Sequence, residues 1–156
     1  VIATASTAAK QDLARSAGAD LAIGYEDFAI RVKEFTDGKG VNVIYDGVGQ
    51  STFEQGLQAL GRRGTFAIFG AASGQVEPIE IMKISTGSIF LTRPTLADFV
   101  ATREELLWRA NDVFAAFLRN DLKIAIVASY ALSQASDAHL NLENRTSTGK
   151  LILKIR

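Results

Sequence analysis

The chain has 156 residues, 47% of them apolar, and its 17 basic side chains are balanced by 17 acidic ones. This composition predicts a soluble globular protein with a sizeable core, and the balanced charge argues against nucleic acid as a partner. No apolar run approaches the roughly 20 residues that span a bilayer. The absence of cysteine excludes disulfides and thiolate zinc sites, and the single histidine, His139, leaves little for metal binding.

The first part of the chain alternates short apolar runs with helical patterns. In order, it predicts a strand at residues 1–5, a helix ending near Gly18, a strand at residues 21–23 and an amphipathic helix at residues 27–36. Ser6 or Thr7 is placed to cap the first helix. Phe35 is expected on the inner face of the second.

The middle of the chain has a strand-helix-strand pattern. An almost continuous apolar run at residues 41–46 leads into Asp-Gly-Val-Gly, helical spacing covers residues 51–60, and a second apolar run at residues 64–70 ends in glycine. Such runs are typical of parallel strands, and we expect the first to be buried on both faces. Open α/β sheets bind ligands beyond the carboxyl ends of their strands, so glycines at those ends predict a nucleotide-binding edge.

The remaining sequence continues the alternation. It predicts a short helix at residues 78–84, a strand at 87–92, a long helix at 101–118, a strand at 126–130, a helix at 136–142 and a strand at 150–155. We therefore expect an α/β fold with a doubly wound, mainly parallel, Rossmann-like sheet and helices on both faces. The change of pattern near residues 120–123 predicts a boundary between a nucleotide-binding domain at 1–123 and a piece of another domain at 124–156.

Candidate cofactor contacts lie at the end of the first strand. No Gly-x-Gly-x-x-Gly turn occurs at a strand-helix junction, so we interpret residues 1–5 as the second strand of a nucleotide-binding fold. Its end carries Thr4 and Ser6 but no carboxylate, and Lys10 follows one helical turn later. Hydroxyls, a helix N-terminus and an ammonium suit a 2′-phosphate. The alternative is that Ser6 caps the helix and that Lys10 is only solvated.

Four other side chains each have two interpretations. Tyr25, after a strand, either stacks on an adenine or is a half-buried surface tyrosine. Asp46 is either a general base or, as is commoner in such turns, an acceptor for backbone amides. His139 has no evident partner and is expected to serve packing or the surface. Arg145 either clamps an anion or ends a solvated helix, and both interpretations stay open.

Three stretches in combination resemble one known family. They are Val-Ile-Tyr-Asp-Gly-Val-Gly at residues 43–49, Arg-Arg-Gly-Thr-Phe-Ala-Ile-Phe-Gly at 62–70 and Gly-Ser-Ile-Phe-Leu-Thr-Arg-Pro-Thr at 87–95, with support from 102–106 and 143–150. The chain is similar here, and over essentially its whole length, to the zinc-independent quinone oxidoreductases (zeta-crystallin-like) of the medium-chain dehydrogenase/reductase superfamily.

The resemblance implies NADPH as the cofactor, bound along the strand ends, and neither a metal nor an acid-base residue in this chain. Ser6 and Lys10 would hold the 2′-phosphate, with Tyr25 beside them. The other implied contacts are Val48 on the adenosine side, Phe69, Gly70 and Ala71 at the nicotinamide ribose, Leu91 and Thr92 at the nicotinamide end, and Arg145 from the C-terminal segment.

The resemblance also implies an activity, which is NADPH-dependent reduction of a quinone or a related α,β-unsaturated carbonyl (enone) in the cytoplasm. A homodimer would form through the edge strand between Ser88 and Thr92. An enoyl reductase for acyl thioesters, or a non-enzymatic nucleotide-binding or crystallin-type protein, would share these motifs. The family's first nucleotide-fold strand and its glycine turn precede Val1, so we expect the downstream part of a longer enzyme, with residues 124–156 closing its catalytic domain.

Overall fold

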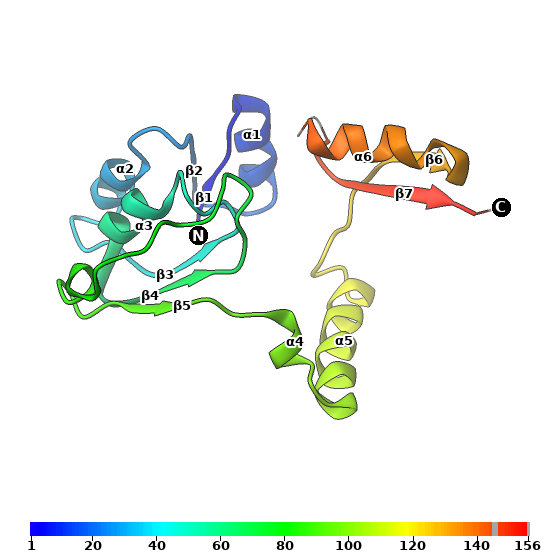
Figure 1. The fold of residues 1–156 in the computed structure, drawn as a ribbon. Helices are drawn as coiled ribbons and strands as arrows, with labels where there is room; N and C mark the ends of the chain where they lie inside the picture. The colour runs from blue at the N-terminus through cyan, green and yellow to red at the C-terminus, as the bar shows by residue number, and fades with distance from the viewer. Residues whose placement is uncertain (145–146, 156) are drawn as a thin grey trace. The chain divides into compact units, whose positions relative to one another are not determined.

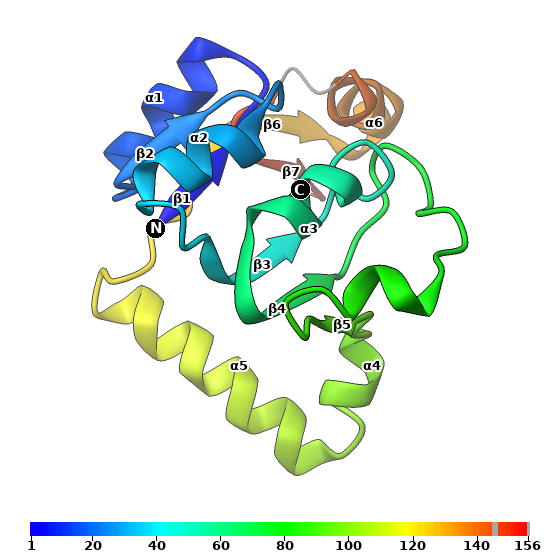
Figure 2. The ribbon, with the colours of Figure 1, turned by 90° about the vertical axis from the view of Figure 1, so that its left-hand side faces the viewer.

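A computed structural model describes residues 1–144 and 147–155, in two units, Val1–Asp98 and Phe99–Arg156 (Figures 1 and 2). The first unit contains strands β1 (Ile2–Thr4), β2 (Leu21–Ile23), β3 (Val41–Asp46), β4 (Leu60–Ile68) and β5 (Phe90–Thr92), with helices α1 (Ala8–Ser16), α2 (Phe28–Phe35) and α3 (Phe53–Ala59) and the 3₁₀ turn η1 (Ile81–Ile84). Helix α4 (Leu96–Phe99) crosses the border between the units.

The second unit consists of one long helix followed by a strand-helix-strand segment. Its elements are α5 (Arg103–Leu118), β6 (Ile126–Ala131), the 3₁₀ turn η2 (Leu132–Gln134), α6 (Ala135–Glu143) and β7 (Lys150–Lys154). Helix α5 begins in a capping box, in which the Thr102 side chain accepts from the Glu105 amide and the Glu105 carboxylate accepts from the Thr102 amide. No helix among the described residues is long and apolar enough to cross a membrane.

All the strand pairs of the described residues are parallel. The sheets are β1-β2, β3-β4-β5 and β6-β7, and each connection from β1 to β5 passes through a helix or a helical turn. The α/β class and the parallel pairing predicted from the sequence are therefore confirmed. Neither β1 nor β3 has a strand on its second edge within the described residues, so the first unit holds two separate sheets.

The first helix is capped as the sequence indicates. Thr7 is the N-cap, and its hydroxyl accepts a hydrogen bond of 3.3 Å from the Lys10 amide. Of the two candidates, Thr7 and not Ser6 therefore caps α1. Gly18, with φ of +105°, follows the helix in the left-handed conformation that glycine adopts without steric cost.

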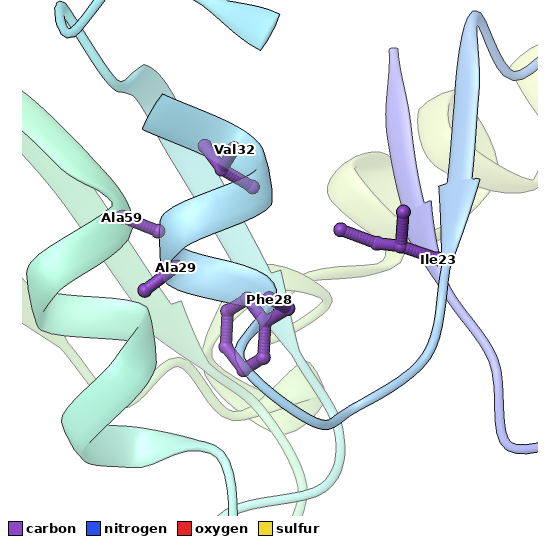
Figure 3. Close-up of a cluster of buried hydrophobic side chains, with 5 residues drawn as sticks. All are labelled: Ile23, Phe28, Ala29, Val32 and Ala59. Atoms are coloured by element: carbon purple, nitrogen blue, oxygen red, sulfur yellow. The ribbon is translucent and has the colours of Figure 1, made fainter. Parts of the chain in front are cut away.

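The core of the first unit has two clusters of buried side chains. One joins β2, α2 and α3 and contains Ile23, Phe28, Ala29, Val32 and Ala59 (Figure 3). The other joins α3 to β4 and contains Phe53, Leu60, Phe66 and Ile68. The rings of Phe53 and Phe66 stack with centroids 5.6 Å apart.

Some sequence predictions about these elements are wrong. Residues 41–46 form a strand, but one that is not buried on both faces, because Val43 is 45% and Tyr45 78% exposed. Alternate side chains point to opposite faces, and Ile44 on the other face packs into the core. Phe35 is 52% exposed rather than inward. Helicity within residues 78–84 is confined to η1, and α4 was not predicted.

Candidate functional site: the carboxyl edge of the parallel strands

Two glycine turns lie against each other beyond β3 and β4. The amides of Phe69 and Gly70 donate to the carbonyl of Asp46 at 2.9 and 3.3 Å, and the Ala72 amide donates to the Gly47 carbonyl at 3.2 Å. The Ser73 amide and hydroxyl both donate to the Val48 carbonyl, each at 2.8 Å. Because strands β3 and β4 are parallel, both turns lie at the same edge of the sheet. Their hydrogen bonds join residues 46–49 to residues 69–73, and we call this pair of turns the ledge.

Glycine is required where these turns touch. A Cβ on Gly70 would lie 2.4 Å from the Gly47 carbonyl oxygen, and one on Gly49, whose φ is +89°, would lie 2.6 Å from the Gly74 carbonyl oxygen. The sequence suggested that such glycines admit a ligand. In the structure the neighbouring turn takes that space, so both glycines serve the approach of backbone to backbone.

Asp46 holds the first turn together. Its carboxylate is buried and accepts hydrogen bonds from the amides of Val48 at 2.6 Å and Gly49 at 3.2 Å, and from the Thr52 hydroxyl at 2.7 Å. The interpretation of Asp46 as an acceptor for backbone amides is therefore confirmed. With its oxygens committed in this way, the carboxylate is a structural group and a poor general base.

Replacing Asp46 is expected to loosen this ledge. In Asp46→Ala the half-buried Val48 amide and the buried Gly49 amide lose their acceptor, which should lower the free energy of unfolding by roughly 2–4 kcal/mol. Asp46→Asn keeps one oxygen acceptor and should lose less. Urea unfolding measures both variants, with Asp112→Ala on the exposed surface of α5 as the control. Equal losses for Asp46→Ala and Asp112→Ala would show that these hydrogen bonds contribute nothing.

An open pocket of about 580 Å³ lies at the ends of β4 and β5. It brings together four of the predicted contacts, Gly70, Ala71, Leu91 and Thr92. Sequence reasoning did not predict the rest of its lining, which is Phe53, Ile68, Gln75, Val76, Glu77, Ile79 and Arg93. Two other predicted contacts lie nearby. Val48 is half-buried, and Phe69 is exposed. The Phe69 ring lies over Gly47, where an added Cβ would come within 3.1 Å of it.

The other predicted contacts lie at the ends of β1 and β2. Thr4 ends β1, Ser6 is exposed before α1, and Lys10 is partly buried in the first turn of that helix. Tyr25 follows β2 and is 36% exposed. Since β1 and β2 are parallel, their ends share an edge. A second pocket, of about 340 Å³, contains none of these four residues. Arg145 lies outside the described residues.

The described residues offer no site for zinc. The chain has no cysteine and one histidine. Within residues 1–144 and 147–155, no three or more His, Asp or Glu side chains come together in a way that could hold a metal ion. A structural or catalytic zinc in proteins needs three or four such ligands, so the residues described here do not fit one.

Parallel strands joined through helices, with a pocket at their carboxyl ends, define the Rossmann-like class of nucleotide-binding proteins. Comparison with known families agrees. The sequence profile of the family described as zinc-binding dehydrogenase matches residues 1–118. The chain belongs to this family, and through it to the medium-chain dehydrogenase/reductase superfamily. The family's name refers to a metal for which the described residues of this chain provide no ligand set.

Several curated proteins are similar to nearly the whole of this chain. A probable quinone oxidoreductase of Schizosaccharomyces pombe is 40% identical over 98% of this chain and 46% of its own length. A 2-haloacrylate reductase of a Burkholderia species is 36% identical over 98% of this chain and 47% of its own length. The chain thus spans about half the length of the curated relatives it matches.

Two similar solved structures are complexes with NADPH. A mycobacterial protein bound to NADPH is 43% identical, with a TM-score of 0.92 over 98% of this chain and 49% of its own. The Escherichia coli quinone oxidoreductase bound to NADPH is 38% identical, also with a TM-score of 0.92, over 97% of this chain and 48% of its own. The Rossmann-like fold expected from the sequence is confirmed by this likeness.

Proposed function

We propose that this chain is the cofactor-binding part of an oxidoreductase that uses NADPH to reduce quinones or related α,β-unsaturated carbonyls. The observation that carries the proposal is the match of nearly the whole chain to two NADPH complexes at 38% and 43% identity. The pocket at the carboxyl ends of β4 and β5 supports it, because its volume is within the roughly 300–1,000 Å³ typical of small-molecule sites.

NADPH would run along the strand ends in this proposal. Ser6 and Lys10, with Thr4 behind them, would hold the 2′-phosphate at the start of α1, where the helix dipole also favours an anion. Tyr25 would lie beside the adenine. At the other end, the nicotinamide would enter the pocket lined by Gly70, Ala71, Leu91 and Thr92, with Phe69 near its ribose. Val48 would line the adenosine side. Arg145 would add a contact from the C-terminal segment.

The bound nicotinamide would supply the reducing equivalent, and this chain would supply position and environment. The walls of the pocket include the apolar side chains Phe53, Ile68 and Leu91, which would keep water from a flat ring. The ledge of glycine turns, held by Asp46, would set the floor against which the cofactor lies. We assign no acid-base residue and no metal to this chain.

Turnover by the intact enzyme tests the proposal. We expect NADPH to be oxidised with a quinone or an enone, including a 2-haloacrylate, and NADH to be used less well. An enoyl reductase would instead prefer acyl thioesters, and a crystallin-type protein would bind NADPH without turning over any of these acceptors. Absence of NADPH binding in calorimetry would refute the proposal.

We further propose that two copies associate through β5. This strand pairs with β4 on one edge, and its second edge has no strand among the described residues. Phe90 on this strand is 62% exposed. A short apolar edge strand of this kind offers unpaired backbone groups to a second copy, which would join the two sheets between Ser88 and Thr92.

A charge on this edge should dissociate the dimer. In Phe90→Lys, two like charges would meet across the two-fold axis, and we expect the dimer dissociation constant to rise by about tenfold or more. Ile81→Lys in η1, where the side chain is 73% exposed, is the control and should leave association unchanged. Light scattering over a range of concentrations measures both. A monodisperse wild-type monomer at high concentration would contradict the proposal.

The domain border and the location of the protein remain proposals as well. We place the end of the partial NADP-binding domain at residue 123 and assign residues 124–156 to the catalytic domain of the intact enzyme. We also propose that the enzyme is cytoplasmic and works without zinc. Activity that survives a strong chelator, and is not raised by added zinc, is the expected result.

A further inference from the structure

We infer that Gln55 is a positioning residue of the cofactor site, because its side chain fixes the loop that carries Tyr25. The Gln55 amide nitrogen donates to the Tyr25 carbonyl at 3.2 Å, and the Gln55 amide oxygen accepts from the Ala29 amide at 3.3 Å. One side chain on α3 therefore ties down both the loop after β2 and the start of α2. This inference rests on the function proposed above.

Close contact between α2 and α3 places Gln55 there. Ala29 on α2 and Ala59 on α3 are 4% and 1% exposed, and Figure 3 shows them where the two helices lie side by side. Such small side chains let two helices approach closely. Gln55 precedes Ala59 by four residues, so it lies on the same face of α3, one turn nearer the end of β3. At this position the side-chain amide of Gln55 reaches the N-terminus of α2.

The start of α2 needs an external acceptor. Its N-cap, Asp27, has φ of +50° and makes no side-chain capping bond. The Ile30 and Arg31 amides donate to the Asp27 carbonyl, but the Ala29 amide in the buried first turn has no such partner within the helix. The first amides of a helix lack intrahelical acceptors, and the Gln55 oxygen takes the place of the missing cap for Ala29.

The amide nitrogen of Gln55 holds the loop between β2 and α2 in place. Among the described residues, no backbone-to-backbone hydrogen bond holds Tyr25 or Glu26. The bond from Gln55 to the Tyr25 carbonyl therefore constrains a backbone that has few constraints of its own. Loss of this bond would allow Tyr25 to sample other positions, and a ligand would then have to order it on binding. This free-energy cost would weaken binding of the adenosine half of NADPH, which Tyr25 would contact.

The experiment compares two halves of the cofactor as probes in the intact enzyme. The probes are 2′,5′-ADP for the adenosine half and reduced nicotinamide mononucleotide for the other. Gln55→Met keeps the length and removes both hydrogen bonds, whereas Gln55→Glu keeps the acceptor for Ala29 and removes the donor to Tyr25. Gln58→Met is the matched control, on the same helix at an exposed position.

We expect Gln55→Met and Gln55→Glu to raise the dissociation constant of 2′,5′-ADP by about three- to tenfold. Affinity for the nicotinamide half should stay within about twofold of wild type, and amide hydrogen exchange should rise at residues 24–29. Gln58→Met should change none of these. Faster exchange with unchanged 2′,5′-ADP affinity would overturn the inference, as would an equal loss for both halves, which indicates general destabilisation. If the wild type itself binds no 2′,5′-ADP, the proposed function and this inference both fail.

Discussion

This 156-residue chain by itself is expected to turn over no NADPH, and activity should appear when the upstream half of the enzyme is supplied in trans. The structure holds β1-β2 and β3-β4-β5 as separate sheets, and within residues 1–144 and 147–155 no strand lies on the second edge of β1 or of β3. In the intact enzyme proposed above, a strand, a glycine-rich turn and a helix would lie between these edges. Much of the affinity for a pyrophosphate in such folds comes from the amides of that turn and from that helix's dipole.

The free edges also bear on stability. Backbone groups that lose their partners cost on the order of 1–3 kcal/mol each where water cannot replace them, against a typical total stability of about 5–15 kcal/mol. The apolar side chains of Val43 and Tyr45 on β3 are exposed as well. We therefore expect the chain to be marginally stable and to gain structure with a partner that supplies the strand.

The complementation assay mixes the two halves and follows NADPH oxidation with a quinone. Circular dichroism and urea unfolding record the gain in structure in parallel. The control is an upstream half from which the strand, glycine turn and helix have been removed, and it should restore neither activity nor stability. Full activity from the present chain without any partner would refute the argument.

Lys10→Glu is expected to lower the preference of the intact enzyme for NADPH over NADH by about tenfold or more. One charge-assisted hydrogen bond contributes roughly 1.5–3 kcal/mol, and the substitution replaces this attraction with repulsion. The change should not unfold α1. Lys10 lies in the first turn of α1, and that turn contains no acidic residue. A carboxylate in a first turn interacts favourably with the helix dipole.

Steady-state kinetics with both cofactors measure this change as the ratio of kcat/KM values. Lys39→Glu provides the control, because Lys39 is exposed between α2 and β3, at the amino ends of the strands. It alters the net charge by the same amount and should leave the ratio unchanged. A wild-type ratio in Lys10→Glu would show that this lysine does not meet the 2′-phosphate.

The sequence by itself determined the local structure and the order of the elements. Apolar runs ending in glycine predicted β3 and β4, and helical spacing predicted α2 and α5, because these patterns depend on the periods of strands and helices. The position of Asp46 before Gly47 predicted its bonds to backbone amides, since the partners lie two and three residues away. The carboxyl edge followed from the parallel pairing of strands that helices connect.

Only the tertiary structure decided which surfaces meet. Both faces of the strand at residues 41–46 carry apolar side chains, and the partial burial of Ile44 but not of Tyr45 depends on which neighbours are present. Phe53 and Ile79 join Leu91 around one pocket, although they are far apart in the sequence. Gln55 reaches Ala29 across 26 residues because two alanines let α2 and α3 come close. A sequence pattern records which residues share a face of one element, whereas contacts between elements arise from the packing of the whole unit.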